Sequence, residues 1–73
     1  MMAPGICVRV GRKIRYLRTK SGMTQEVLGG LANVTQNNLS RIESGKAEPG
    51  LITLGAIAHA LGVKLSDLLD GVD

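Results

Sequence analysis

Aromatic residues and cysteine are almost absent from this sequence. Among its 73 residues there is one tyrosine, no phenylalanine and no tryptophan. Without aromatic side chains, the core of a folded domain must be built from Leu, Ile, Val and Ala, as in compact helical domains. The single cysteine, Cys7, cannot form an internal disulfide, which excludes the disulfide-stapled scaffolds typical of small secreted proteins. We interpret Cys7 as a core residue or a free thiol.

Membrane, metal and catalytic signatures are lacking as well. The longest apolar run is far shorter than the roughly 20 residues that a membrane-spanning helix requires, and no signal-peptide pattern is present. No group of Cys and His residues has metal-ligand spacing. The only histidine, His59, has no nucleophile or second ligand near it in the sequence. We therefore expect a cytoplasmic protein that is not an enzyme, holds no metal or cofactor and does not bind a membrane.

The positive charges are concentrated in the first third of the chain. The sequence has nine Lys and Arg against six Asp and Glu, a net charge of +3. Six of the basic residues precede the first acid, Glu26, and they are Arg9, Arg12, Lys13, Arg15, Arg18 and Lys20. Such a basic block is typical of a phosphate-binding surface, and a solvated helix face is the alternative.

The spacing of apolar residues predicts a compact all-α domain of five short helices. We expect a lead-in over 1–8, in which Pro4-Gly5 prevents an early helix, then a domain over 9–69 and a tail over 70–73. The helices are expected over about 8–21, 25–32, 36–44, 51–61 and 65–69.

Residues with known capping chemistry mark the helix ends. Thr24 and Thr35 can each accept a hydrogen bond from the first turn of the helix that follows. Gly22 and Asn33 suit the left-handed conformation that ends a helix. Gly29 lies in the middle of the second expected helix, where glycine is costly, so we expect another helix to cross closely there.

The same periodicity predicts which apolar side chains face the core. The expected inward stripes are Val10, Ile14 and Leu17; Leu28, Leu31 and Ala32; Leu39 and Ile42; and Leu51, Leu54, Ala58 and Leu61. Near the C-terminus, further apolar side chains exceed what a small domain can cover with its own core. They are Leu65, Leu68, Leu69 and Val72, and we expect this region to join two copies of the chain.

The third expected helix carries a polar outer face. Gln36, Asn37, Ser40 and Arg41 project from one side of it, with Asn38 at the flank. Amides, a hydroxyl and a guanidinium are the groups that pair with base edges in the major groove. Residues 25–44 are expected to form two short helices joined by a tight turn, and the second helix carries this polar face. This arrangement is typical of a unit that reads DNA.

A series of spaced motifs extends through residues 9–69. They are Ile-Arg-x-Leu-Arg at 14–18, Gly22-Met23-Thr24-Gln25-Glu26, Val34-Thr35-Gln36, Ile42-Glu43-Ser44-Gly45-Lys46, Pro49, Thr53-Leu54 and Ala60-Leu61-Gly62-Val63. In this register they resemble the lambda-repressor/Cro-type helix-turn-helix family, often called XRE. The resemblance implies a five-helix domain that binds double-stranded DNA and regulates transcription.

The resemblance also implies roles for individual residues. Gln36 matches the usual reader of adenine, and Gln25 matches a glutamine that clamps a phosphate and that reader. The backbone amides and side chain near Lys46 match a loop that holds phosphate. Arg18 and Glu43 match an ion pair between the first and third helices. Four further residues match positions that vary with the operator: Asn37, Asn38, Ser40 and Arg41. We also count Thr35, the expected cap of the reading helix, among the DNA-binding candidates.

We therefore predict a sequence-specific transcriptional regulator that acts as a homodimer on a near-palindromic operator, because one reading helix makes too few base contacts. A phage-type repressor, a restriction–modification controller and a regulator of a plasmid or mobile element all fit. The alternative is a protein-interaction module of the same fold, such as an antitoxin or a bridging coactivator, with a protein partner.

Overall fold

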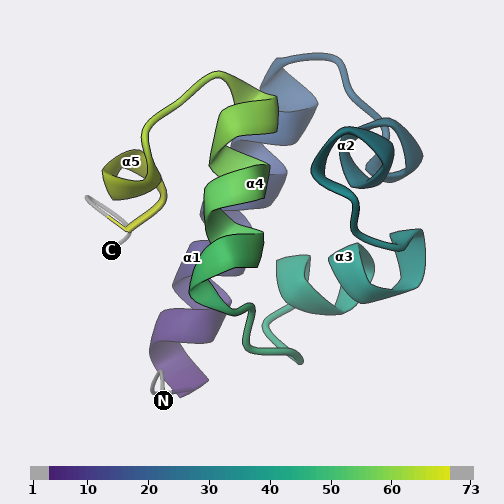
Figure 1. Cartoon of the computed structure of the whole chain (residues 1–73). Helices are drawn as coiled ribbons and strands as arrows, with labels where there is room; N and C mark the ends of the chain where they lie inside the picture. Colours follow the sequence, from purple (N-terminus) through teal and green to yellow (C-terminus); the bar gives the residue numbers. More distant parts are fainter. Residues whose placement is uncertain (1–3, 70–73) are drawn as a thin grey trace.

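The computed structural model describes residues 4–69, which form five helices and no strand. The helices are α1 (Pro4–Lys20), α2 (Gln25–Ala32), α3 (Gln36–Glu43), α4 (Leu51–Leu61) and α5 (Leu65–Leu69). In Figure 1, α4 crosses in front of α1, with α2 and α3 to one side and α5 to the other. The prediction of a compact all-α domain is confirmed. No helix in the described part of the chain is long and apolar enough to cross a membrane.

The first helix begins earlier than the sequence pattern predicted. It starts at Pro4 and includes Gly5, so the expected break at these two residues is wrong. Proline is tolerated in the first turn of a helix, because the N–H that it lacks would have no helical partner there and its fixed φ suits the helix. Residues 1–3 and the tail predicted over 70–73 lie outside the described residues.

The predicted helix caps are confirmed. The Thr24 hydroxyl accepts a hydrogen bond from the backbone N–H of Val27, and the Thr35 hydroxyl accepts one from that of Asn38, both at 3.1 Å. Asn33 has φ of 58°, the left-handed conformation expected at the end of α2. A short turn between two capped helices therefore sets the angle at which α3 leaves α2.

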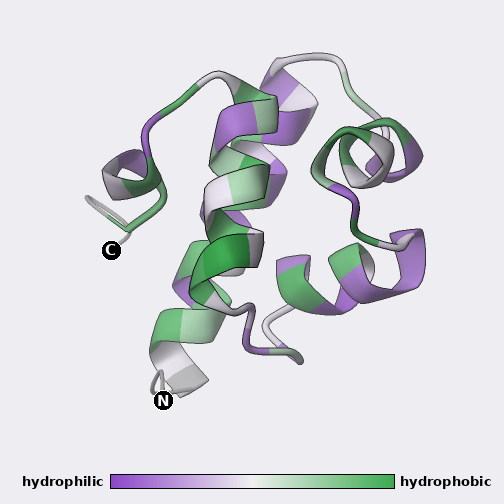
Figure 2. Ribbon diagram, viewed as in Figure 1, coloured by the Kyte–Doolittle hydropathy of each residue, from purple (hydrophilic) through white to green (hydrophobic). Residues whose placement is uncertain are grey.

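The core is formed by one cluster of aliphatic side chains from all five helices. Its buried members are Val10, Ile14, Leu28, Ala32, Leu39, Ile42, Leu54, Ile57, Ala58 and Leu68. In Figure 2 the ribbon of α4 is mostly apolar, whereas the start of α3 is polar. Cys7 is also buried, as a free thiol.

Two residues expected in the core are exposed instead. Leu31 is 62% exposed and Leu51 is 71% exposed, whereas Ile57, which the expected stripe omitted, is fully buried. The inner side of α2 is formed by Leu28, Gly29 and Ala32, which turns Leu31 outward. Leu51 is the first residue of α4, and the buried side of that helix is formed by Leu54, Ile57 and Ala58.

Two glycines allow close backbone contacts. A methyl group on Gly29 would clash with the carbonyl oxygen of Val34, in the turn between α2 and α3. The predicted close approach at Gly29 is therefore present, but its partner is this turn and not another helix. A methyl group on Gly11 would clash with the backbone of Ile42 and Glu43. The crossing at Gly11 brings the end of α3 against α1, which positions Glu43 beside the arginines of α1.

Candidate nucleic-acid interface

The exposed side of α3 carries most of the residues predicted to read DNA. Leu39, Ile42 and Glu43 form the buried side of this helix, and Ser40 is half-buried between the two sides. The exposed candidates are Gln36, Asn37, Asn38 and Arg41. Because residues three and four apart are neighbours on a helix surface, these side chains form one continuous polar face.

Thr35 stands at the start of this face as the N-cap of α3. Its side chain is exposed, and its oxygen already accepts the hydrogen bond from the Asn38 N–H. A hydroxyl has one donor in addition to its acceptor sites. Thr35 can therefore cap the helix and still donate a hydrogen bond to an anionic ligand.

Gln25, the first residue of α2, is half-buried and points partly inward. Its side-chain amide Nε2 donates a hydrogen bond of 3.1 Å to Oε1 of Glu43. The resemblance implied a clamp on a phosphate and on Gln36, whereas the structure uses one N–H of the Gln25 amide for Glu43. Since an amide NH₂ has two donors, the second N–H remains able to contact a phosphate.

Arg18 and Glu43 form a bidentate ion pair between α1 and α3. Arg18 Nε lies 2.6 Å from Glu43 Oε2, and Nη2 lies 3.0 Å from Oε1. The third guanidinium nitrogen, Nη1, donates to the carbonyl of Met23 at 2.8 Å. The Glu43 side chain is fully buried and that of Arg18 is 12% exposed. This geometry holds the end of α3 to α1 and to the turn before α2.

Arg15 is a further partner of Glu43 that the sequence analysis missed. Its Nε lies 3.4 Å from Glu43 Oε1, and its side chain is about half exposed. The signal was present in the spacing, because residues three apart share one side of a helix and Arg15 precedes Arg18 by three. We call the four side chains of Arg15, Arg18, Gln25 and Glu43 the Glu43 cluster.

The surroundings of Glu43 favour its charged form. Burial alone raises the pKa of this carboxyl, but the hydrogen bonds from Arg18, Gln25 and Arg15 and the positive charge of Arg18 together hold its pKa below the usual value. No buried polar side-chain atom among the described residues lacks a hydrogen-bond partner. The cluster is therefore a satisfied buried network that keeps α3 in a fixed orientation.

The loop after α3 does not offer the backbone amides that the resemblance implied for phosphate. The N–H groups of Ser44, Gly45 and Lys46 donate to the carbonyls of Ser40, Ile42 and Arg41 respectively. With Gly45 at φ of 76°, this is the Schellman arrangement, in which the residues after a helix satisfy its last carbonyl groups.

The side chain of Lys46 is exposed and stays available. Arg41 Nη2 donates to the Lys46 carbonyl at 3.3 Å on the protein surface. This contact keeps the Arg41 guanidinium at the end of α3 that adjoins the loop.

The basic block of α1 is divided between two sides of the helix. Arg15 and Arg18 belong to the Glu43 cluster. The other four basic residues are on surfaces that are exposed or partly exposed, and they are Arg9, Arg12, Lys13 and Lys20. The block is therefore not a single phosphate-binding surface next to α3.

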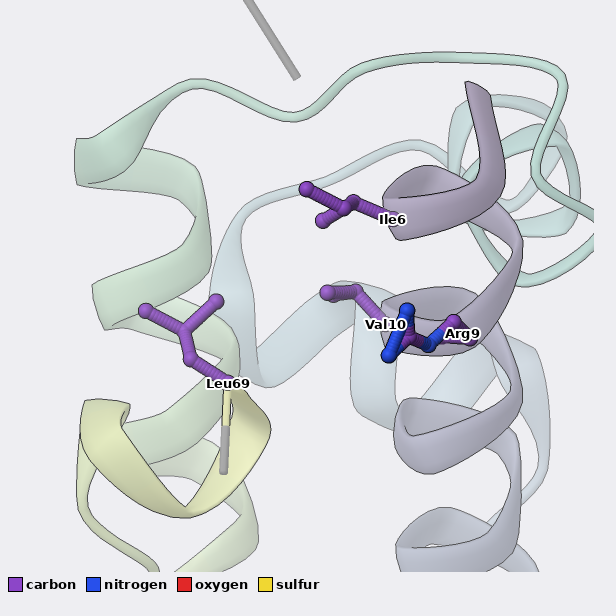
Figure 3. A pocket seen from close by; sticks show the side chains of 4 residues that line it. All are labelled: Ile6, Arg9, Val10 and Leu69. Carbon is purple, nitrogen blue, oxygen red and sulfur yellow. The ribbon is translucent and has the colours of Figure 1, made fainter. Parts of the chain in front are cut away.

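An apolar groove lies on the opposite side of the molecule from α2. Ile6, Val10 and Leu69 line a cavity of about 360 Å³ together with Arg9. Figure 3 shows Ile6 of α1 and Leu69 of α5 directed into the space between their helices. A neighbouring hollow adds Leu51 to the lining. We call Ile6, Leu51 and Leu69, which are 43%, 71% and 49% exposed, the apolar surface.

The C-terminal leucines contribute unequally to this surface. Leu68, which the sequence analysis offered as surplus apolar area, is fully buried in the core, so that prediction is wrong for this residue. Leu65 is half-buried against the same core. Val72 lies outside the described residues. Among the predicted C-terminal residues that the structure describes, Leu69 is exposed.

Comparison with known proteins agrees with this architecture. The model of the helix-turn-helix family HTH_3 matches residues 14–68. Control protein C.BamHI from Bacillus amyloliquefaciens is 37% identical over 70 residues, which are 94% of this chain and 86% of that protein. The HTH-type transcriptional regulator DdrOP3 from Deinococcus deserti is 32% identical over 66 residues, which are 90% of this chain. The chain spans about half of DdrOP3, 51% of its length.

A solved structure shows the same fold. The restriction-modification controller protein C.AhdI from Aeromonas hydrophila superposes with a TM-score of 0.83 at 29% identity, over 85% of this chain and 94% of that one. The capped α2–turn–α3 unit defines a helix-turn-helix protein. The chain belongs to the helix-turn-helix family, among its XRE-type transcriptional regulators.

Proposed function

We propose that this protein binds a specific sequence of double-stranded DNA as a homodimer, with α3 in the major groove, and so regulates transcription. The observation that carries the proposal is the two-sided character of α3. Its inner side is locked by the core and the Glu43 cluster, while its outer side presents amides and a guanidinium to solvent. A rigid helix with a solvent-exposed polar face suits base readout, because hydrogen bonds to base edges require side chains held in register.

Each candidate residue has a role that its position supports. Gln36 can make a bidentate pair with adenine, and Arg41 can pair with guanine or bind a phosphate. The remaining polar residues of the face adjust the sequence preference. Residues at the ends of α2 and α3 position the protein on phosphates, which fixes its register without reading sequence. The residues that adjust the sequence preference are Asn37, Asn38 and Ser40. The residues that position the protein on phosphates are Gln25, Thr35 and Lys46.

The apolar surface supports assembly into a dimer. Large aliphatic side chains that are substantially exposed mark interaction sites when they are grouped. Ile6, Leu51 and Leu69 are grouped at one end of the molecule, away from the polar face of α3. Joining two copies there leaves both reading helices free, and a two-fold arrangement requires them about 34 Å apart to match one turn of DNA.

The relatives support the same class of role. C.BamHI is named as a control protein and C.AhdI as a restriction-modification controller, and both match this chain over most of their own length. We infer a controller or repressor of a small gene set, acting through an inverted-repeat operator.

Selection from a random DNA pool tests the proposal. Duplexes retained by the protein at low salt should converge on one motif with two inverted half-sites, about 10 base pairs apart from centre to centre. The affinity for the selected duplex should fall steeply between about 50 and 200 mM salt. A pool that yields no retained duplex at low salt contradicts the proposed function.

A further inference from the structure

Four residues of α1 form a row on the side of the helix that faces away from α3. Gly11 marks the side that touches α3, because its backbone lies against that of Ile42 and Glu43. At about 100° per residue, the row lies about 140–180° around α1 from Gly11. Its members are Arg9, Lys13, Tyr16 and Lys20, and we call them the outer row.

The charges of the outer row are not neutralised within the described residues. None of its three cations forms an ion pair there, whereas both α1 arginines on the α3 side bind Glu43. No acidic residue is present anywhere in α1. Tyr16 is 56% exposed, and Lys20 Nζ lies 5.6 Å from the centre of its ring. Arg12, also exposed, adds a further cation at the flank of the row.

The outer row and the polar face of α3 point to opposite sides of the α1–α3 pair. On α3, Ile42 and Glu43 face α1, and the exposed candidates project from the other side. On α1, the outer row is on the side remote from Gly11. A straight duplex that lies along α3 therefore cannot also contact the outer row of the same subunit.

We propose that the outer row is a second DNA-binding site, which holds the phosphate backbone of a separate duplex segment without reading its sequence. The site goes beyond the proposed operator binding. From Arg9 to Lys20 the row extends over 12 residues, about 16 Å of helix, and it presents only positive charge and one aromatic edge. Duplex DNA carries one negative charge per about 1.7 Å of its axis, so a linear row of cations is complementary to it. A protein with both sites bridges two duplex segments.

A bridging assay tests this proposal. The selected operator duplex is immobilised and saturated with protein, free protein is washed away, and a labelled duplex of random sequence is added at about 50 mM salt, where electrostatic binding is strong. Wild type should retain the labelled duplex. The double variant Lys13→Gln/Lys20→Gln should bind the operator normally and retain little of the labelled duplex.

The matched control is Lys64→Glu, which changes the net charge by the same amount at an exposed site outside α1. It should retain the labelled duplex as wild type does. No retention by wild type, or equal retention by wild type and the double variant, overturns the proposal. If an acidic polypeptide such as polyglutamate displaces the labelled duplex as well as unlabelled duplex does, the assignment to DNA is wrong.

A second measurement separates this proposal from the operator proposal. If no operator is selected, wild type and the double variant are each titrated with random-sequence duplex over a range of salt concentrations. Loss of two phosphate contacts should reduce the slope of log affinity against log salt by about 2 in the double variant, and Lys64→Glu should leave it unchanged. Equal slopes for wild type and the double variant overturn the second site regardless of operator binding.

Discussion

The side-chain amide of Gln25 donates a 3.1 Å hydrogen bond to the buried carboxylate of Glu43. Gln25 begins α2 at the edge of the proposed DNA surface, and Glu43 ends α3 beneath it. The same carboxylate binds Arg18 of α1. One buried acid thus connects α1 and α2 to α3, the helix that presents the reading face, so its loss should weaken both the fold and the DNA contact.

Removal of Glu43 should destabilise the protein strongly. Removing one partner of a buried ion pair typically lowers the free energy of unfolding by about 3–5 kcal/mol, because the other charge is left buried without compensation. Glu43→Ala should therefore melt far below wild type in a circular-dichroism experiment. Glu26→Ala, which removes an exposed acid from the first turn of α2, is the control and should cost no more than about 1 kcal/mol. Equal melting temperatures would show that the pair contributes little.

Stability should decrease in acid because of the same residue. The native pKa of Glu43 is lowered from 4.5 by its hydrogen bonds and by Arg18, against the effect of burial. A group with a lowered native pKa contributes stability above its unfolded pKa and loses it as pH falls through the native value. The free energy of unfolding should thus decline from about pH 4.5 downward.

Glu43→Gln provides the comparison for this pH effect, since the amide does not titrate. In urea titrations at a series of pH values, the variant should be less stable than wild type near neutral pH. The difference between the two proteins should narrow in acid. A difference that stays constant from neutral pH to about pH 2, well below the ordinary glutamate pKa, would contradict the assigned titration.

Readout should depend on Gln36, and general affinity on Lys46. Gln36→Ala should cost about 1–3 kcal/mol of binding and relax the preference at one base position, whereas a phosphate contact such as Lys46 should affect all sequences about equally. The measurement is a selection from random DNA with each variant, followed by titration of the selected duplexes. An unchanged motif for Gln36→Ala would place α3 in a different register on DNA.

Replacing each of the two adjacent glycines of α2 by alanine should change the stability of the protein in opposite directions. Gly29→Ala should destabilise the protein, because its methyl group meets the Val34 carbonyl in the turn. Gly30 has open space around its Cα, and alanine is about 1 kcal/mol better than glycine inside a helix. Gly30→Ala should thus raise the melting temperature. A higher melting temperature for Gly29→Ala would show that the turn adjusts freely, and a lower one for Gly30→Ala would contradict the open space at that position.

Dimer formation should require the apolar surface. Leu51→Asp and Leu69→Asp should each shift the protein toward monomer in sedimentation equilibrium at tens of micromolar, a concentration range on the order of weak-dimer affinities. Leu31→Asp is the matched control, because Leu31 is 62% exposed on α2, away from this surface. Wild type that stays monomeric under these conditions, or an equal effect from Leu31→Asp, contradicts the proposed interface.

The five helices and most of their ends could be predicted from the residue pattern, because they depend on local physics. Thr24 and Thr35 cap the helices that follow them, and Asn33 adopts the left-handed conformation, as expected from neighbouring backbone groups alone. The Arg18–Glu43 contact was implied by the family resemblance and is present in the structure. The break predicted at Pro4 is absent, because a proline disrupts a helix interior but is compatible with the first turn.

The rotation of each short helix about its axis, and the contacts of its side chains, depend on packing between helices and could not be predicted from local pattern. Helical periodicity identifies a stripe on α2, but packing against the turn and α4 buries Gly29 and exposes Leu31. The contacts of Arg15 and Gln25 with Glu43 join residues 28 and 18 positions apart, a separation that no local rule spans. The division of the α1 cations between the Glu43 cluster and the outer row follows from where α3 crosses α1 at Gly11.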